Sequence, residues 1–232
     1  MADELNFASA LVSEVCLDLP VAAIDPIEMN RYLGYPADAV PAPRVAEQIA
    51  AIVAGALACI RPRGVYSLYK VAERTAHSLK LGGTTISGNI GEYLNDAGRV
   101  AVFAVTVGEE ISHLATSKEG DAFAAWVVDA TGSWAVEAAA DALMLRMRHY
   151  LLDGEELTLR YSPGYCGMEI GEQRKLFQLV QADAVGVTLM PSMLMHPLKS
   201  ISGLIGLAPK ETVSQYRSPC EICPRTGCHM RR

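Results

Sequence analysis

The sequence lacks any long apolar run. Its longest stretch without a charged or strongly polar residue covers residues 49–60, well short of the roughly 20 residues that a membrane-spanning helix needs. Near the start, Asp3 and Glu4 stand where a secretory signal would carry basic residues. We therefore expect no transmembrane span and a cytoplasmic location.

An excess of positive charge is also missing. The 232 residues carry a formal net charge of −6, so the chain has no general attraction for nucleic acid or for an anionic membrane. Residues 213–232 are the local exception, with four arginines and one glutamate. A small zinc module that contacts nucleic acid is one interpretation of this segment, and the acidic remainder and the absence of interleaved aromatic residues argue against it.

Cysteine is scarce, and the chain is long enough to fold around a hydrophobic core without disulfides. Three of the six cysteines, Cys220, Cys223 and Cys228, nevertheless fall within nine residues. In a reducing compartment such clustered thiols indicate a metal before a disulfide. With Cys166 or His229 as a fourth ligand, an iron–sulfur cluster and a zinc ion both remain open, and the alternative is a basic tail with free thiols.

The chain shows no repeat and no long linker, which predicts one domain over residues 1–212 followed by a Cys-rich basic tail over 213–232. Valine- and tyrosine-rich segments bounded by glycine predict strands at 64–71 and 99–107. Later in the chain, strands are predicted at 157–161, 185–189 and 200–205. Helical patterns cover 44–60, 108–116, 121–150 and 171–180. The first of these helices is apolar nearly all round, which predicts burial on several sides, and Gly132 is expected to bend the longest one.

This mixed order of helices and strands favours an α+β fold, with a twisted, largely antiparallel sheet flanked by helices. On the longest predicted helix, Asp129, Ser133, Glu137 and Asp141 recur every four residues and so share one side. A solvated helix face is the ordinary explanation of such a stripe.

Two polar stretches interrupt the later strands and helices. Arg-Tyr-Ser-Pro-Gly-Tyr-Cys at 160–166 lies between a predicted strand and a helix. Its Pro163-Gly164 pair makes a tight turn that lets a ligand approach the backbone, with Arg160 and Tyr165 on either side. Met-His-Pro-Leu-Lys-Ser-Ile-Ser-Gly at 195–203 is the second stretch.

These pieces resemble, in their order along the chain, the activation domain of cobalamin-dependent methionine synthases. The resemblance covers about residues 24–209, and its motifs lie at 31–35, 106–108, Glu137, 160–165 and 195–203. It implies that the chain acts as a stand-alone protein of this family, with S-adenosylmethionine as methyl donor and a cobalamin that is bound only transiently or held on a partner. The implied partners are a corrinoid-binding protein or cobalamin-dependent methyltransferase and an electron donor protein.

The same resemblance assigns roles to individual residues. Arg160 would grip the carboxylate of S-adenosylmethionine and Glu137 would face its cationic portion, because a zwitterionic sulfonium ligand needs one fixed charge of each sign. The remaining cofactor-binding candidates line the turn or belong to the second stretch: Ser162, Gly164, Tyr165, His196, Ser200, Ser202 and Gly203. His196 would reach toward the cobalamin. No catalytic residue is assigned, and a non-catalytic module that binds the corrinoid or S-adenosylmethionine is the alternative function.

Overall fold

The structure, a computed structural model, describes residues 9–21, 24, 26–36, 39–118, 120–165 and 167–213. The four cysteines predicted to bind a metal, Cys166, Cys220, Cys223 and Cys228, lie outside these residues. The same is true of the Cys-rich tail from residue 214 onward.

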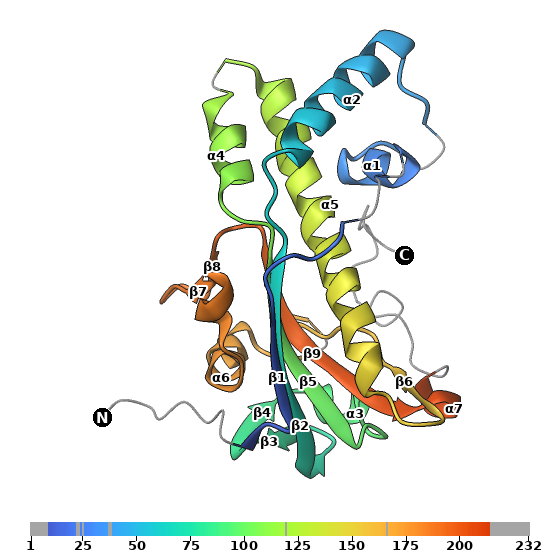
Figure 1. The fold of residues 1–232 in the computed structure, drawn as a ribbon, viewed down its shortest axis with the longest axis vertical. Coiled ribbons are helices and arrows are strands. Elements are labelled where there is room, and N and C mark those ends of the chain that lie inside the picture. The colour runs from blue at the N-terminus through green and yellow to red at the C-terminus, as the bar shows by residue number, and fades with distance from the viewer. Residues whose placement is uncertain are drawn as a thin grey trace.

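An antiparallel sheet runs through the middle of the molecule (Figure 1). Its strands follow the order β4-β3-β2-β5-β9-β6, and β1 pairs with residues 64–68 of β2, before the part of β2 that pairs with β3. A separate hairpin joins β7 to β8. The strand bounds are β1 Val12–Cys16, β2 Arg63–Thr75, β3 Ser78–Leu81, β4 Thr84–Ser87, β5 Arg99–Thr106, β6 Glu155–Leu157, β7 Thr188–Leu189, β8 Met195–His196 and β9 Ser200–Pro209.

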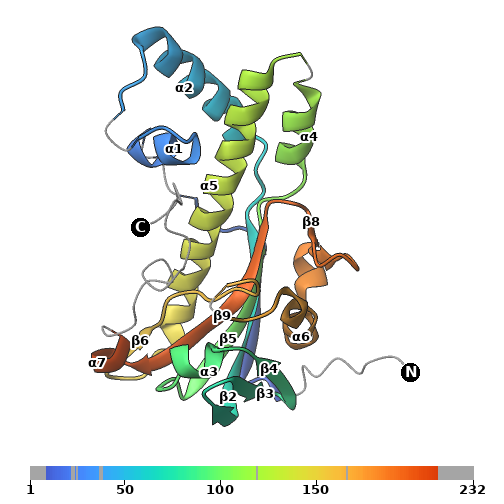
Figure 2. The same ribbon diagram turned by 180° about the vertical axis from the view of Figure 1, so that it is seen from behind.

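Helices cover both faces of this sheet (Figures 1 and 2). The long helix α5 lies across one face, while α6 and α3 lie on the other, and α2 and α4 pack beside the N-terminal half of α5. The helix bounds are α1 Pro26–Tyr32, α2 Pro43–Leu57, α3 Ile90–Tyr93, α4 Glu110–Ser117, α5 Ala122–Met147, α6 Gln173–Leu179 and α7 Lys210–Val213. Among the described residues, no helix combines the length and hydropathy that crossing a bilayer requires.

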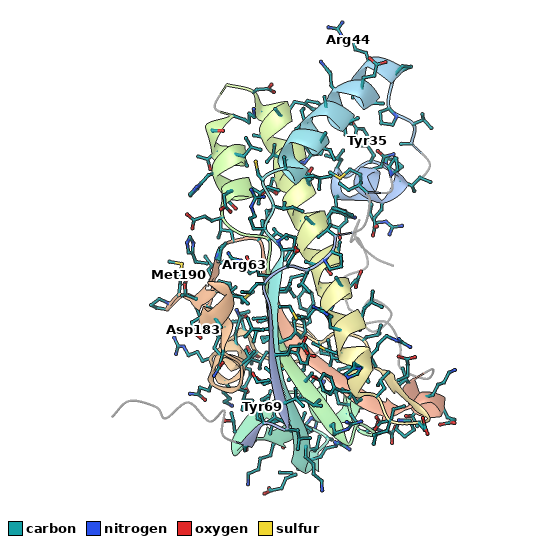
Figure 3. The ribbon with its side chains drawn as sticks, viewed as in Figure 1. Tyr35, Arg44, Arg63, Tyr69, Asp183 and Met190 are labelled. Atoms are coloured by element: carbon teal, nitrogen blue, oxygen red, sulfur yellow. The ribbon has the colours of Figure 1, made fainter. Side chains whose placement is uncertain are left out.

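Alternation along the central strands builds a separate core on each face. On β5, Phe103 packs toward α5 with Ile205 of β9, whereas Val102 packs toward α6 with Leu204. Every β5 residue after Arg99 is buried, so this strand contributes to both cores. On the α6 side, the buried hydroxyl of Tyr69 (Figure 3) donates to the Leu179 carbonyl at 2.6 Å.

The predicted fold class is confirmed, but two details of the helices were wrong. Helix α2 buries only Ile49 and Ala56 and exposes much of the rest, because its neighbours cover one side and alanine costs little to leave in water. Helix α5 continues through Gly132. A Cβ at Gly132 would meet Lys199 Cγ at 3.1 Å and Ile111 Cδ1 at 3.2 Å, so glycine serves close packing there and not a bend.

Two predicted strands are also shorter than expected. The strand predicted at 157–161 ends as a ladder at Leu157, and Tyr161 rejoins the sheet only as an isolated bridge to Leu204. The segment 182–185 forms a 3-10 turn, and only Thr188–Leu189 of the strand predicted at 185–189 pairs.

Candidate functional site

Arg160 joins the loop after β6 to helix α5. Its Nη2 lies 2.7 Å from Glu137 Oε2, and its Nη1 contacts Asp141 Oδ1. The arginine side chain is 18% exposed, compared with 40% for Glu137 and 69% for Asp141. The fold therefore brings together the predicted guanidinium and carboxylate, which are 23 residues apart in sequence, and adds Asp141, which the sequence placed only in the helix stripe.

Lys199 makes an equivalent bridge to α5, nearer the N-terminus of this helix. Its Nζ lies 2.7 Å from Asp129 Oδ1 and donates to Ser133 Oγ at 2.9 Å. All four members of the stripe expected to be a solvated face thus contact a cation from another segment. Lys199 belongs to the second polar stretch of the sequence, at 195–203. The sequence of that stretch does not predict which residues Lys199 contacts.

Backbone pairing fixes the turn that follows Arg160 against strand β9. Tyr161 N donates to Leu204 O at 3.0 Å, and Leu204 N donates to Tyr161 O at 2.8 Å. A Cβ at Gly203 would stand 2.6 Å from Tyr161 O and 3.1 Å from Ser162 Oγ. Only glycine at position 203 lets the turn approach so closely, and this contact puts Ser162 beside β9.

The turn itself closes through short local hydrogen bonds. Tyr165 N donates to Ser162 O at 3.2 Å, and Gly164 N donates to Met168 O at 2.8 Å. Gly164 adopts φ +90°, a backbone conformation that favours glycine. The Tyr165 side chain is 65% exposed, so the turn that follows Arg160 presents an aromatic ring to solvent.

The second predicted stretch is divided between different surroundings. Ser202 is buried on the side of β9 that carries Leu204, opposite Gly203, and its hydroxyl finds no hydrogen-bond partner in the described chain. Ser200 Oγ donates to Pro197 O at 2.7 Å. His196 lies on the β7–β8 hairpin, where its Nε2 is 3.0 Å from Glu109 Oε2.

The structure therefore joins Arg160 to Glu137 and places Ser162 against Gly203, with Gly164 and Tyr165 in the turn that follows. Across the described ranges, no three His, Cys, Asp or Glu side chains are arranged to hold a metal ion.

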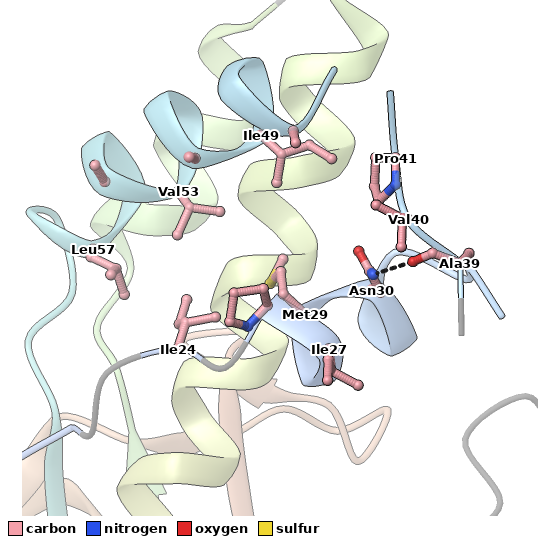
Figure 4. A pocket seen from close by; sticks show the side chains of 14 residues that line it. Ile24, Ile27, Met29, Asn30, Ala39, Val40, Pro41, Ile49, Val53 and Leu57 are labelled. Atoms are coloured by element: carbon pink, nitrogen blue, oxygen red, sulfur yellow. Dashed lines mark hydrogen bonds between the residues drawn. The ribbon is translucent and has the colours of Figure 1, made fainter. Parts of the chain in front are cut away.

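A separate pocket of about 740 Å³ lies between α1 and α2 (Figure 4). Apolar side chains such as Ile49, Val53 and Leu57 line it, and its amide side chain, Asn30, donates to Ala39 O at 2.9 Å. The described lining contains no charged group. Its described lining therefore holds no charge that would recognise a zwitterion. The contact of Arg160 with Glu137 and Asp141 of α5, here called the ligand seam, does hold such charges.

The seam supplies one guanidinium and two carboxylates within contact distance. Glu137 uses Oε2 for Arg160, while its Oε1 makes no hydrogen bond to the described residues. A ligand with a carboxylate and a nearby cation would match this pair, because charge-assisted hydrogen bonds favour both ends at once. The chemistry that the geometry supports is recognition and positioning of such a ligand.

Comparisons with known proteins agree with this fold. The family model described as "Vitamin B12 dependent methionine synthase, activation domain" matches residues 90–217, more than half of the chain. Among solved structures, the crystal structure of the MetH reactivation domain bound to AdoHcy is similar, with a TM-score of 0.59 and 20% sequence identity, covering 84% of this chain and 81% of that chain. No curated protein matches the chain.

Proposed function

Because the chain belongs to the vitamin B12 dependent methionine synthase activation domain family, we propose that it supports reductive reactivation of a cobalamin held by a partner protein. The cobalamin substrate in its Co(II) state takes one electron from a donor protein and becomes Co(I). Co(I) then attacks the methyl group of S-adenosylmethionine: a cobalt–carbon bond forms, the sulfur–methyl bond breaks, and methyl-Co(III) and S-adenosylhomocysteine result.

The contribution of this chain is to bind and orient the methyl donor. The observation that supports this role is the convergence of Arg160 and Glu137 at 2.7 Å on one seam. Arg160 would hold the donor's carboxylate and Glu137 its cationic portion, with Ser162 and Gly164 beside the adenosine and Tyr165 at the open edge. The solved relative was crystallised with AdoHcy, the demethylated form of the same ligand.

Calorimetric titration with S-adenosylmethionine and S-adenosylhomocysteine tests the binding step. We expect Arg160→Ala to weaken both affinities at least about tenfold, because it removes charge-assisted hydrogen bonds worth about 1.5–3 kcal/mol. Arg148→Ala is the matched control. Arg148 forms an ion pair with Glu156, with 2.7 Å between Nη1 and Oε1, and it contacts neither Glu137 nor Asp141. Failure of the intact protein to bind either ligand would contradict the proposal.

A reconstituted assay tests the reaction. Conversion of Co(II) to methyl-Co(III), followed by absorption with a corrinoid protein and a chemical or protein reductant, should depend on both S-adenosylmethionine and this chain. Binding of the methyl donor without product above background would instead support the non-catalytic binding module.

A further inference from the structure

We propose that Asp141 is an internal competitor for the ligand's carboxylate: it occupies Arg160 while the site is empty and gives way when the ligand binds. Asp141 would thereby set how strongly the site depends on the amino acid end of the ligand. This inference rests on the proposed function and adds a residue that regulates the same site.

The geometry of the guanidinium carries the first step. Its two terminal nitrogens are each taken by a different carboxylate, Nη1 by Asp141 and Nη2 by Glu137. A ligand carboxylate binds arginine through the same donors. The guanidinium has further N–H donors, but a ligand carboxylate that binds Nη1 or Nη2 on the side held by a protein carboxylate must displace that carboxylate.

Solvation decides which carboxylate leaves. Asp141 is 69% exposed, so water can replace Arg160 around it, and exposed ion pairs contribute little to stability. Glu137 is the less exposed of the two, and its Oε1 is still available among the described residues to face the ligand's ammonium group. The incoming carboxylate therefore takes the Nη1 position of Asp141, and Glu137 stays.

The same helix provides a matched comparison. Asp129 forms an ion pair with Lys199 at 2.7 Å and is 61% exposed, so its chemistry and solvation are close to those of Asp141. Asp129 and Asp141 are twelve residues apart on the helix, which corresponds to about 18 Å along its axis. Asp129 does not contact Arg160 and should not compete for the ligand.

The test is calorimetric titration of the full chain and of Asp141→Asn with S-adenosylhomocysteine. This ligand has the amino acid end without the sulfonium charge, so loss of a nearby negative charge perturbs it least. We expect Asp141→Asn to bind it about two- to fivefold more tightly than the unmodified chain, with the gain shrinking as salt is added. Glu137→Gln should change the affinity in the opposite direction.

Two controls separate competition from a general effect on folding. Asp129→Asn should bind S-adenosylhomocysteine as the unmodified chain does. Affinity for 5′-methylthioadenosine, which lacks both the carboxylate and the ammonium group, should be the same for Asp141→Asn and the unmodified chain.

Unchanged or weaker S-adenosylhomocysteine binding by Asp141→Asn would overturn the inference while leaving the proposed function intact, provided the unmodified chain binds. An equal gain for 5′-methylthioadenosine would also overturn it. If the unmodified chain binds neither adenosylated amino acid, the proposed function fails and the inference fails with it.

Discussion

Glu14, away from the ligand seam, accepts hydrogen bonds from three different side chains. Tyr66 Oη donates to it at 2.5 Å, Tyr150 Oη at 3.3 Å and the Cys16 thiol at 3.5 Å. The hydrogen bond from Tyr66 is the main cause that lowers the pKa of Glu14 below its ordinary 4.5. Burial raises the pKa of the Cys16 thiol and of the Tyr66 hydroxyl, so both remain protonated donors at neutral pH.

Glu14→Gln should reduce the free energy of unfolding by about 1–2 kcal/mol at pH 7, because the hydrogen bonds lose their charge assistance. A carboxylate with a lowered folded pKa stabilises above pH 4.5, and this contribution is lost as the pH falls through the folded pKa. The difference between the two proteins should therefore shrink below pH 4.5. Urea unfolding at several pH values measures it, with Glu73→Gln at the exposed Lys80 ion pair as the control; a difference independent of pH would contradict this account.

At the scale of elements, strand β9 links the sheet to the ligand seam through one glycine. Gly203→Ala would place a Cβ 2.6 Å from Tyr161 O and 3.0 Å from Phe103 Cε1. The turn at 160–165 must then move away from the strand, and Arg160 moves with it.

We expect Gly203→Ala to bind S-adenosylhomocysteine at least about tenfold more weakly, because this turn positions the arginine. Gly98→Ala is the control, since a Cβ there meets nothing within 4 Å. Calorimetry measures the affinities and circular dichroism checks the fold; an unchanged affinity for Gly203→Ala would show that the turn tolerates the displacement.

Elements with a long and consistent pattern could be predicted from the sequence, and short ones could not. Strand β5 and helix α5 carry many apolar residues and clear boundaries, and both were predicted. Strands β3 and β4 have four residues each, and no strand is predicted in the segment that holds them. Strand β1 pairs on one side only and alternates weakly, so its local sequence carries little strand signal.

The candidate site was predictable only in part, for a similar reason. Arg160 and Glu137 were named through the family resemblance. The contacts of Asp141 and Lys199 depend on where the loop after β6 and the start of β9 pack against α5. A local sequence pattern does not predict such tertiary contacts. The resemblance also named His196 and Ser202, and the structure places His196 beside Glu109 and Ser202 on the side of β9 opposite Gly203.

At the scale of the whole molecule, the described chain forms two cores on one sheet, and the cysteine cluster follows the last described residue, Val213. The metal prediction for Cys166, Cys220, Cys223 and Cys228 stays a prediction, because these residues lie outside the part of the chain that the structure describes.

Anaerobically purified protein should contain stoichiometric zinc, or iron with sulfide and a visible absorption band. Replacing Cys220, Cys223 and Cys228 by serine should abolish the metal content, while Cys59→Ser, at a half-buried thiol elsewhere, should leave it unchanged. Metal analysis that finds neither element in the intact chain would leave a basic tail with free thiols.

Asp141, which contacts Arg160, and Tyr165, in the turn that follows, are both largely exposed to solvent. A ligand bound by Arg160 would therefore remain accessible from solvent. A methyl donor lying there would keep one side uncovered. A planar macrocycle bound to a second protein could then approach this exposed side. The methyl group could be transferred while the methyl donor and the macrocycle each stay bound to their own protein.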